Sequence, residues 1–303
     1  ARIDLVYRRW NGSEWSDETT IVTGEDKYGY GDAAVVADRE NPNNIVLFCA
    51  AGNVFFTNSQ KNKPLRCHRF RSSNGGKEWL DPDDDGIIGT DITDHIYGIP
   101  AGYKGYFFSS GRICQSSQIK VGSHYRLYAA LCAFEGKTLF GSVKTHSVVI
   151  YSDDFGDTWK QLGDVAVSGG NEAKCEELPN GNVLVSSRKA GGRYYRVYNY
   201  GGIENVTSTV PTPGSWGSTT ATVLSEADKG STNGEVLIIP AIEKSTGNSC
   251  NILLQSLPME SGRTKVGIYW TKLSSDNITN ADVFTKNTWG SYKISDLASA
   301  YSS

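Results

Sequence analysis

The sequence has 303 residues, which is long enough for one large all-β domain or two small ones. Its net charge of −3 argues against a nucleic-acid-binding protein, and no apolar run approaches the roughly 18 residues of a membrane span. Glycine is abundant, at 33 residues, aromatic residues reach 11%, and long apolar repeats with helical spacing are missing. We therefore expect a fold built from short strands and turns.

The first elements are a short strand over residues 3–8 and a turn over 10–16 that ends near Trp15. Residues 33–37 then predict a buried strand, and 45–50 predict the strand that pairs with it. Asp32 lies at the entry of this strand pair, after a glycine-rich approach. A carboxylate in that place either caps the loop or contacts a ligand.

The segment 71–79 keeps a serine, a turn-forming Asn74, glycines and a closing Trp79. Asparagine can cap a turn with its side-chain carbonyl. The acidic residues 81–86 follow, but they lack the ligand spacing and terminal glutamate of an EF-hand, so we expect a solvated loop and no metal site there.

Residues 87–110 show little periodicity and contain several tyrosines and phenylalanines. Long loops in compact domains are often functional, so this segment could wall a pocket. A strand pair is predicted over 111–120 and 125–134, with Arg112 at its start as a further candidate pocket residue.

Residues 152–159, Ser-Asp-Asp-Phe-Gly-Asp-Thr-Trp, predict a tight turn between two strands. Asp154 can bond its own downstream backbone, and Gly156 accepts a positive φ. Burying the ring of Trp159 against this hairpin is worth roughly 2–3 kcal/mol.

A second hairpin follows directly. Residues 175–178 and 183–187 read as strands joined at Asn180-Gly181, the strongest short signal for a hairpin turn. Antiparallel pairing then brings Arg188 back to Glu172. The two charges form either a salt bridge at the rim of the hairpin or part of a functional site.

The rest of the chain predicts further strands, over residues 193–198, 219–224, 236–242, 251–257 and 266–273. Arg263 precedes the last of these, after a loop that contains Ser256, Pro258 and Gly262. Tyr301 stands in an Ala-Tyr-Ser sequence at the end of the chain. An isolated tyrosine there is most often a core or rim residue.

Two of these segments resemble the sialidase (neuraminidase) family. Residues 152–159 match its Asp-box pattern, S-x-D-x-G-x-T-W, and 172–188 are similar to the family segment with a catalytic glutamate, a hairpin and a substrate-binding arginine. The turns at 10–16 and 71–79 resemble degraded Asp boxes. The resemblance implies a six-bladed β-propeller, in which loops of successive blades meet at one end of the central channel.

The same resemblance implies roles for five residues. Tyr301 is the expected nucleophile and Glu172 its general base. Arg188 and Arg263 are expected to bind the substrate carboxylate, and Asp32 to contact its amide or hydroxyl edge. No cofactor is expected.

Two elements of the family are not found in the sequence: the first arginine of the carboxylate-binding triad and the aspartate that acts as acid and base. We therefore expect residues 1–303 to be a single, partial propeller domain, truncated at both ends, with incomplete first and last blades. Such a chain should not be a competent enzyme alone.

The expected activity is exo-α-sialidase hydrolysis of terminal sialic acids, with sialylated glycans as partners. A trans-sialidase, an intramolecular sialidase that forms an anhydro product, and a non-catalytic glycan-binding propeller remain alternatives. A glycan substrate implies a secreted, periplasmic or cell-surface protein, and we expect a monomer. The six cysteines lie mostly in apolar strands and contain no CxxC pair, so we expect buried free thiols, although the even count also permits disulfides.

Overall fold

The computed structural model describes residues 2–53, 65–79, 88–99, 102–137, 143–229, 232–284 and 289–293. These residues form five β-sheets, with two short helices, α2 (Thr93–Gly98) and α3 (Glu226–Lys229), and one 3-10 turn, η1 (Ile203–Asn205). The all-β class predicted from the sequence is confirmed. Among the described residues, no helix is both long and apolar enough to cross a membrane.

The strands are grouped nearly in chain order, except that β7 belongs to the third sheet and β8, which follows it, to the second. The first sheet contains β1 (Leu5–Tyr7) and β2 (Thr19–Val22). The second contains β3 (Gly29–Ala37), β4 (Ile45–Gly52), β5 (Arg66–Ser72), β6 (Thr90–Asp91) and β8 (Gly111–Arg112). The third contains β7 (Gly105–Phe108), β9 (Cys114–Val121), β10 (His124–Lys137), β11 (Val143–Ser152), β12 (Lys160–Gln161) and β13 (Val167–Ser168). The fourth contains β14 (Ala173–Glu177), β15 (Val183–Lys189), β16 (Gly192–Asn199), β17 (Ser215–Trp216) and β18 (Thr220–Thr222). The fifth contains β19 (Val236–Ile242), β20 (Ser249–Glu260), β21 (Thr264–Lys272) and β22 (Gly290–Lys293).

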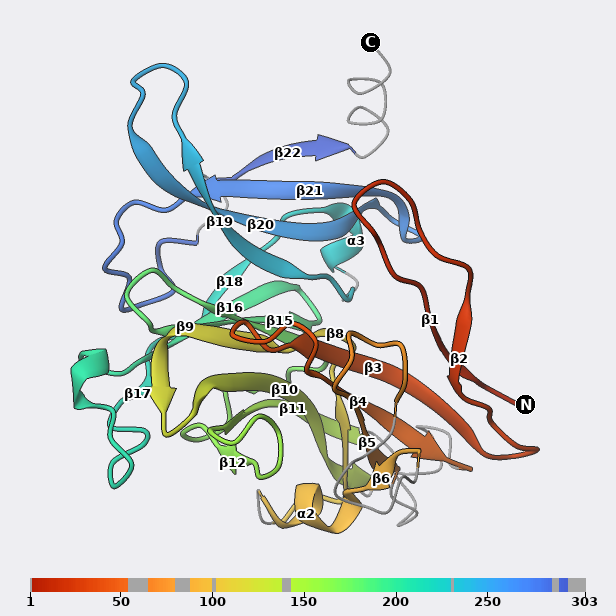
Figure 1. Cartoon of the computed structure of the whole chain (residues 1–303). Helices are drawn as coiled ribbons and strands as arrows, with labels where there is room; N and C mark the ends of the chain where they lie inside the picture. The colour runs from red at the N-terminus through yellow and green to blue at the C-terminus, as the bar shows by residue number, and fades with distance from the viewer. Residues whose placement is uncertain are drawn as a thin grey trace.

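Pairing within the sheets is antiparallel, except that β3 and β8 pair in parallel, with Ala34 opposite Gly111. In Figure 1 the fifth sheet lies at the top, the fourth in the middle and the third below them. None of these sheets closes into a barrel within the described residues. The sheets are instead separate layers.

The apolar core lies between successive sheets. One cluster joins the second sheet to the third, and includes Phe48, Phe108 and Trp159. A second joins the third sheet to the fourth, and a third joins the fourth to the fifth around Tyr195 and Phe284. Each inner sheet is therefore apolar on both faces, because it packs against a neighbour on each side.

The turn predicted at 152–159 is present and is held by side chains. Ser152 Oγ donates to Asp154 Oδ1 at 2.7 Å, and Gly156 N donates to Ser152 Oγ at 2.8 Å. Ser72 makes the same pair of bonds in the turn at 72–79, to Asn74 Oδ1 at 3.0 Å and from Gly76 N at 2.8 Å. The two turns therefore share one hydrogen-bond pattern.

Replacing Asp154 by alanine should destabilise the protein by about 1–2 kcal/mol at pH 7, because the turn loses its bonds to Ser152 and Thr158. Burial alone would raise the pKa of Asp154, but the hydrogen bonds from Thr158 and Ser152 outweigh burial and lower it. A lowered acid pKa stabilises the fold above the unfolded value of about 3.9 and ceases to do so as the pH falls through the folded value. Urea unfolding should show the deficit at pH 7 and a smaller one at the acid end; an equal deficit at both ends would contradict this account.

The segment 87–110 is more ordered than its sequence indicates. Within its described part, α2 packs against β5 and β7, and Tyr97 donates a hydrogen bond to the Leu65 carbonyl at 3.1 Å. Tyr106 and Phe108 of β7 are fully buried. The expected long loop is therefore partly a helix and a core strand, which the local sequence does not reveal because its apolar positions are fixed by distant partners.

All six cysteines are free thiols, as predicted, and five of them are buried. Burial raises the pKa of the Cys114 thiol to about 11. The acidic loop 81–86 lies outside the described residues. Within those residues, no group of three or more His, Cys, Asp or Glu side chains could hold a metal ion.

Candidate active site

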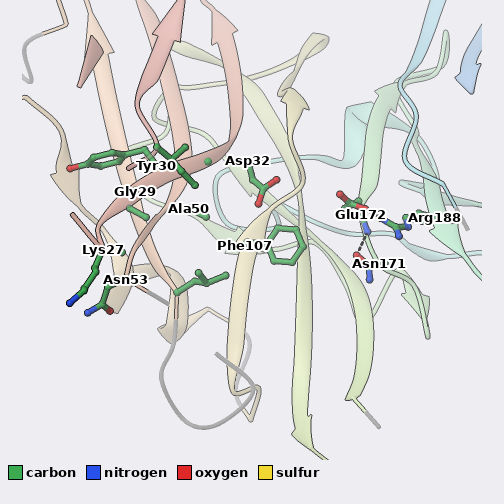
Figure 2. A pocket seen from close by; sticks show the side chains of 15 residues that line it. Lys27, Gly29, Tyr30, Asp32, Ala50, Asn53, Phe107, Asn171, Glu172 and Arg188 are labelled. Carbon is green, nitrogen blue, oxygen red and sulfur yellow. Dashed lines mark hydrogen bonds and ion pairs between the residues drawn. The ribbon is translucent and has the colours of Figure 1, made fainter. Parts of the chain in front are cut away.

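A cavity of about 540 Å³ opens where the second, third and fourth sheets meet. It is lined by Ile3, Lys27, Gly29, Tyr30, Gly31, Asp32, Ala50, Ala51, Gly52, Asn53, Leu65, Phe107, Asn171, Glu172 and Arg188. Three of the five residues predicted from the sequence, Asp32, Glu172 and Arg188, are among them. Figure 2 shows Asn171, Glu172 and Arg188 together on one side of the cavity and Lys27 and Asn53 on the other.

Glu172 and Arg188 are brought together by the predicted hairpin. β14 and β15 pair with Ala173 opposite Ser187, and Gly181 adopts a φ of 80° in the connecting turn. Beyond the paired strands, Arg188 N donates to the Glu172 carbonyl at 2.9 Å, and Asn171 N donates to the Arg188 carbonyl at 2.8 Å. The backbone therefore fixes both residues at the mouth of the cavity.

Their side chains form an ion pair, with Arg188 Nη1 donating to Glu172 Oε2. The side chains are 23% and 16% exposed, respectively, so the pair is partly screened from water yet open to the cavity. Glu172 Oε1 also accepts a hydrogen bond from Asn233 Nδ2 at 3.3 Å. A guanidinium carries five N–H groups, which is a larger number than a single carboxylate can accept. The arrangement fits both readings of the sequence, a salt bridge and a site.

Asp32 reaches the cavity through a β-bulge. In the pairing of β3 with β4, Gly31 lies opposite Ala50 and Ala34 opposite Phe48, so one extra residue is accommodated between them. Asp32 takes a φ of 53° there, a conformation that aspartate tolerates better than most residues. Bulges often re-aim a side chain next to an active site. This bulge re-aims the Asp32 carboxylate in the same way.

The surroundings of Asp32 raise its pKa. The main cause is displacement of water by neighbouring protein, and the second is the negative charge of Glu172. Lys174 acts in the opposite direction and lowers the pKa. Both residues line the same cavity.

Asn171 holds the backbone of Glu172 by a hydrogen bond that its side chain accepts. Its Oδ1 accepts a hydrogen bond from Glu172 N at 2.9 Å and one from Cys132 Sγ at 3.5 Å. Burial, followed by the charge of Glu172, raises the pKa of the Cys132 thiol. We did not predict a role for Asn171, although its position between Gly169-Gly170 and Glu172 is a signal for one.

Other lining residues have no recognisable local motif. Tyr30 and Phe107 contribute aromatic surface, and Lys27 and Asn53 contribute polar groups on the side away from Glu172. Phe107 lies in the segment predicted to wall a pocket, and this prediction is consistent with its place in the cavity.

The other candidates lie elsewhere or are not described. Arg263 is exposed in the turn between β20 and β21, with a φ of 60°, and is not among the lining residues. Tyr301 lies outside the described residues, and the predicted roles of both stay predictions. Arg112 is paired with Glu176 and donates to the Val236 carbonyl at 3.1 Å, so it does not line this cavity.

No family model matches the chain. A protein named Sialidase from Micromonospora viridifaciens is 26% identical over an alignment of 201 residues, which covers 61% of this chain and 27% of the relative. The chain therefore spans about a quarter of the length of that relative.

Solved structures are similar over most of the chain. The leech intramolecular trans-sialidase complexed with 2,7-anhydro-Neu5Ac gives a TM-score of 0.61 at 14% identity, with 96% of this chain and 56% of that chain covered. A mutant of the NanB sialidase from Streptococcus pneumoniae gives 0.62 at 12% identity, with 89% and 54% covered. Trypanosoma rangeli sialidase in complex with sialic acid gives 0.59 at 13% identity, with 89% and 42% covered.

These comparisons confirm the predicted resemblance: the chain is similar to sialidases in sequence and in fold. At these identities the structural likeness shows the fold alone. The chain also covers only about half of the length of these structures, or less.

Proposed function

We propose that the chain is the greater part of the catalytic domain of an exo-α-sialidase, which releases terminal sialic acids from glycoconjugates. The proposal includes a six-bladed β-propeller formed by a single domain with incomplete first and last blades. We also propose that the protein acts outside the cytoplasm and as a monomer. Its substrates would then be sialylated glycoproteins, glycolipids or oligosaccharides.

The observation that supports it most is the convergence of Asp32, Glu172 and Arg188 on one cavity. They come from two sheets and are 156 positions apart at most, from 32 to 188. Sialic acid carries a carboxylate on its anomeric carbon, and a planar guanidinium binds a carboxylate with two parallel charge-assisted hydrogen bonds. Arg188 is therefore suited to bind this sugar, and Arg263 is the proposed second binder.

The substrate carboxylate also explains the proposed nucleophile. A carboxylate nucleophile would be repelled by it, whereas the phenol of Tyr301 is neutral. In the first step the phenolic oxygen bonds to the anomeric carbon, Glu172 takes the phenolic proton, and the glycosidic bond to the aglycone breaks. Most glycosidases use a carboxylate as nucleophile or base, and sialidases are an exception that uses a tyrosine nucleophile. Water then hydrolyses the sialyl-tyrosine, so the anomeric configuration is retained.

The leaving aglycone needs a proton, and we find no aspartate in the family context that supplies it. Neither do we find the first arginine of the triad. We propose that both belong to the full-length protein. Activity should therefore be measured on the natural full-length protein, and ligand binding on either form.

The test is hydrolysis of a fluorogenic α-sialoside by the natural full-length protein, with analysis of the sugar released. Free sialic acid that is first released as the α-anomer supports the proposal. Transfer to an added galactoside or release of an anhydro sugar would contradict hydrolysis and favour the transferase or intramolecular reaction. Binding of sialosides without turnover would contradict the enzyme and favour a glycan-binding propeller.

A further inference from the structure

Asn233 contacts the proposed general base, and the proposed reaction gives it no role. Its side-chain Nδ2 donates a hydrogen bond to Glu172 Oε1 at 3.3 Å and lies 3.4 Å from Ser110 Oγ. Arg188 donates to the other carboxylate oxygen, Oε2. The Glu172 carboxylate is therefore contacted on both oxygens, by a charged guanidinium on one and by a neutral amide on the other.

The residue before Asn233 is anchored to β16. Thr232 is buried, and its carbonyl accepts a hydrogen bond from Arg193 Nη2 at 2.5 Å. The side chain of Arg193 is fully buried, and its Nη2 lies 3.6 Å from Oδ1 of the equally buried Asp228 in α3. In the pairing of β15 with β16, Arg193 stands opposite Arg188. The backbone that carries Asn233 is therefore attached to the same strand pair that carries Arg188.

The residues after Asn233 are anchored to β20. Glu235 N donates to Ser256 Oγ at 3.0 Å, and Ser256 N donates to the Glu235 carbonyl at 2.9 Å. The oxygen of the Asn233 amide is engaged locally, because it accepts a hydrogen bond from Gly234 N at 2.9 Å. The NH2 end of the amide is thus the end that faces Glu172.

The two contacts of Glu172 differ once an anionic sugar binds. Arg188 is the proposed binder of the substrate carboxylate, so the sugar competes with Glu172 for its guanidinium. Asn233 carries no charge and does not line the cavity, so its hydrogen bond does not depend on the sugar. Placement matters here, since a shift of about 1 Å in a reacting group can cost about a hundred-fold in rate.

We propose that Asn233 is a positioning residue, which keeps the Glu172 carboxylate in place when Arg188 turns to the substrate. Asn233 acts through Glu172 and not on the sugar. The inference rests on the proposed function, in which Glu172 takes the proton of the nucleophile. It adds to that function a support for the base that the family resemblance did not supply.

The kinetic test compares Asn233→Leu with the wild-type full-length protein on an aryl sialoside. Leucine keeps the approximate volume of the side chain but removes the amide donor, so kcat should fall about ten- to hundred-fold with KM unchanged. Asn251→Leu is the matched control, because Asn251 Nδ2 donates to Asp276 Oδ1 at 2.9 Å outside the cavity lining. This control should leave both constants unchanged.

Three kinetic results would overturn the proposal: an unchanged kcat in Asn233→Leu, a raised KM with kcat intact, or an equal loss of kcat in Asn251→Leu. The second would indicate a binding residue, and the third a general structural effect. Asn233→Ala guards against misfolding of the leucine variant, because alanine adds no bulk beside Glu172. It should show the same loss of kcat.

Crystal structures of the ligand-free full-length protein test the placement without any sugar. Arg188→Met removes the guanidinium, as competition by the substrate would, and Glu172 should stay against Asn233. In the double variant Arg188→Met with Asn233→Ala, the carboxylate should move away or occupy more than one position. A carboxylate that keeps its place in the double variant would overturn the proposal. If the wild-type protein hydrolyses no sialoside, the proposed function fails, whereas these structures still decide whether Asn233 holds Glu172.

Discussion

Tyr301→Phe should lower the turnover of an aryl sialoside by the full-length protein by at least about a thousand-fold, because phenylalanine lacks the oxygen that bonds to the anomeric carbon. Binding of the sugar should change little, because the ring is retained. Initial rates give the turnover, and calorimetry with free sialic acid gives the affinity. The split between the two quantities identifies a nucleophile and not a binding residue.

Tyr292→Phe is the matched control. Tyr292 is a 53% exposed tyrosine in β22 that stacks on Trp270, and loss of its hydroxyl should leave turnover unchanged. A Tyr301→Phe enzyme with the wild-type rate would show that the nucleophile has been wrongly assigned.

Glu172→Gln should lower kcat by about a hundred- to ten-thousand-fold, the usual contribution of a general base. KM should not rise, because the Glu172 carboxylate no longer competes with the substrate carboxylate for Arg188. A glutamine keeps the shape of the side chain and its acceptor for Asn233. The prediction therefore separates loss of a base from loss of structure.

If Glu172 and Arg188 formed no more than a structural salt bridge, the same variant would lower the melting temperature and leave kcat intact. The exposed pair of Glu226 with Lys229 provides a control of that kind, since Glu226→Gln breaks an ion pair on α3 without touching the cavity. Glu226→Gln should leave both kcat and KM unchanged.

The parts of the site that follow from local rules could be predicted from the sequence. The turn at Asn180-Gly181 fixes the register of β14 and β15, and this register alone brings Arg188 to Glu172. The strand predicted at 236–242 has the bounds of β19. In each case the signal lies within a few residues of the feature that it predicts.

The parts that depend on distant partners could not be predicted. The bulge that turns Asp32 into the cavity arises from the pairing of β3 with β4, and no local signal in the sequence marks a positive φ at that residue. Lys174 lies outside the strand predicted at 175–178, but it belongs to β14, which is buried on both faces because β9, β10 and β19 pack around it. Phe107 and Lys27 meet at the cavity only through the arrangement of the sheets.

The roles of Tyr301 and Arg263 were predicted from the family resemblance, which a single sequence can provide without geometry. Arg263 lies in the turn between β20 and β21, away from the lining of the cavity. Its proposed role therefore requires that a bound sugar, or the full-length protein, bring its guanidinium to the same carboxylate as Arg188.

The central claim is that one anionic sugar is held by these residues together, and a crystal structure of the full-length protein with bound sialic acid tests it most directly. The account predicts the sugar in the cavity of Asp32, Glu172 and Arg188, with its carboxylate hydrogen-bonded to Arg188 and Arg263 and the Tyr301 phenol beside both Glu172 and the anomeric carbon. A sugar bound elsewhere, or a Tyr301 phenol remote from the Glu172 carboxylate, would contradict it.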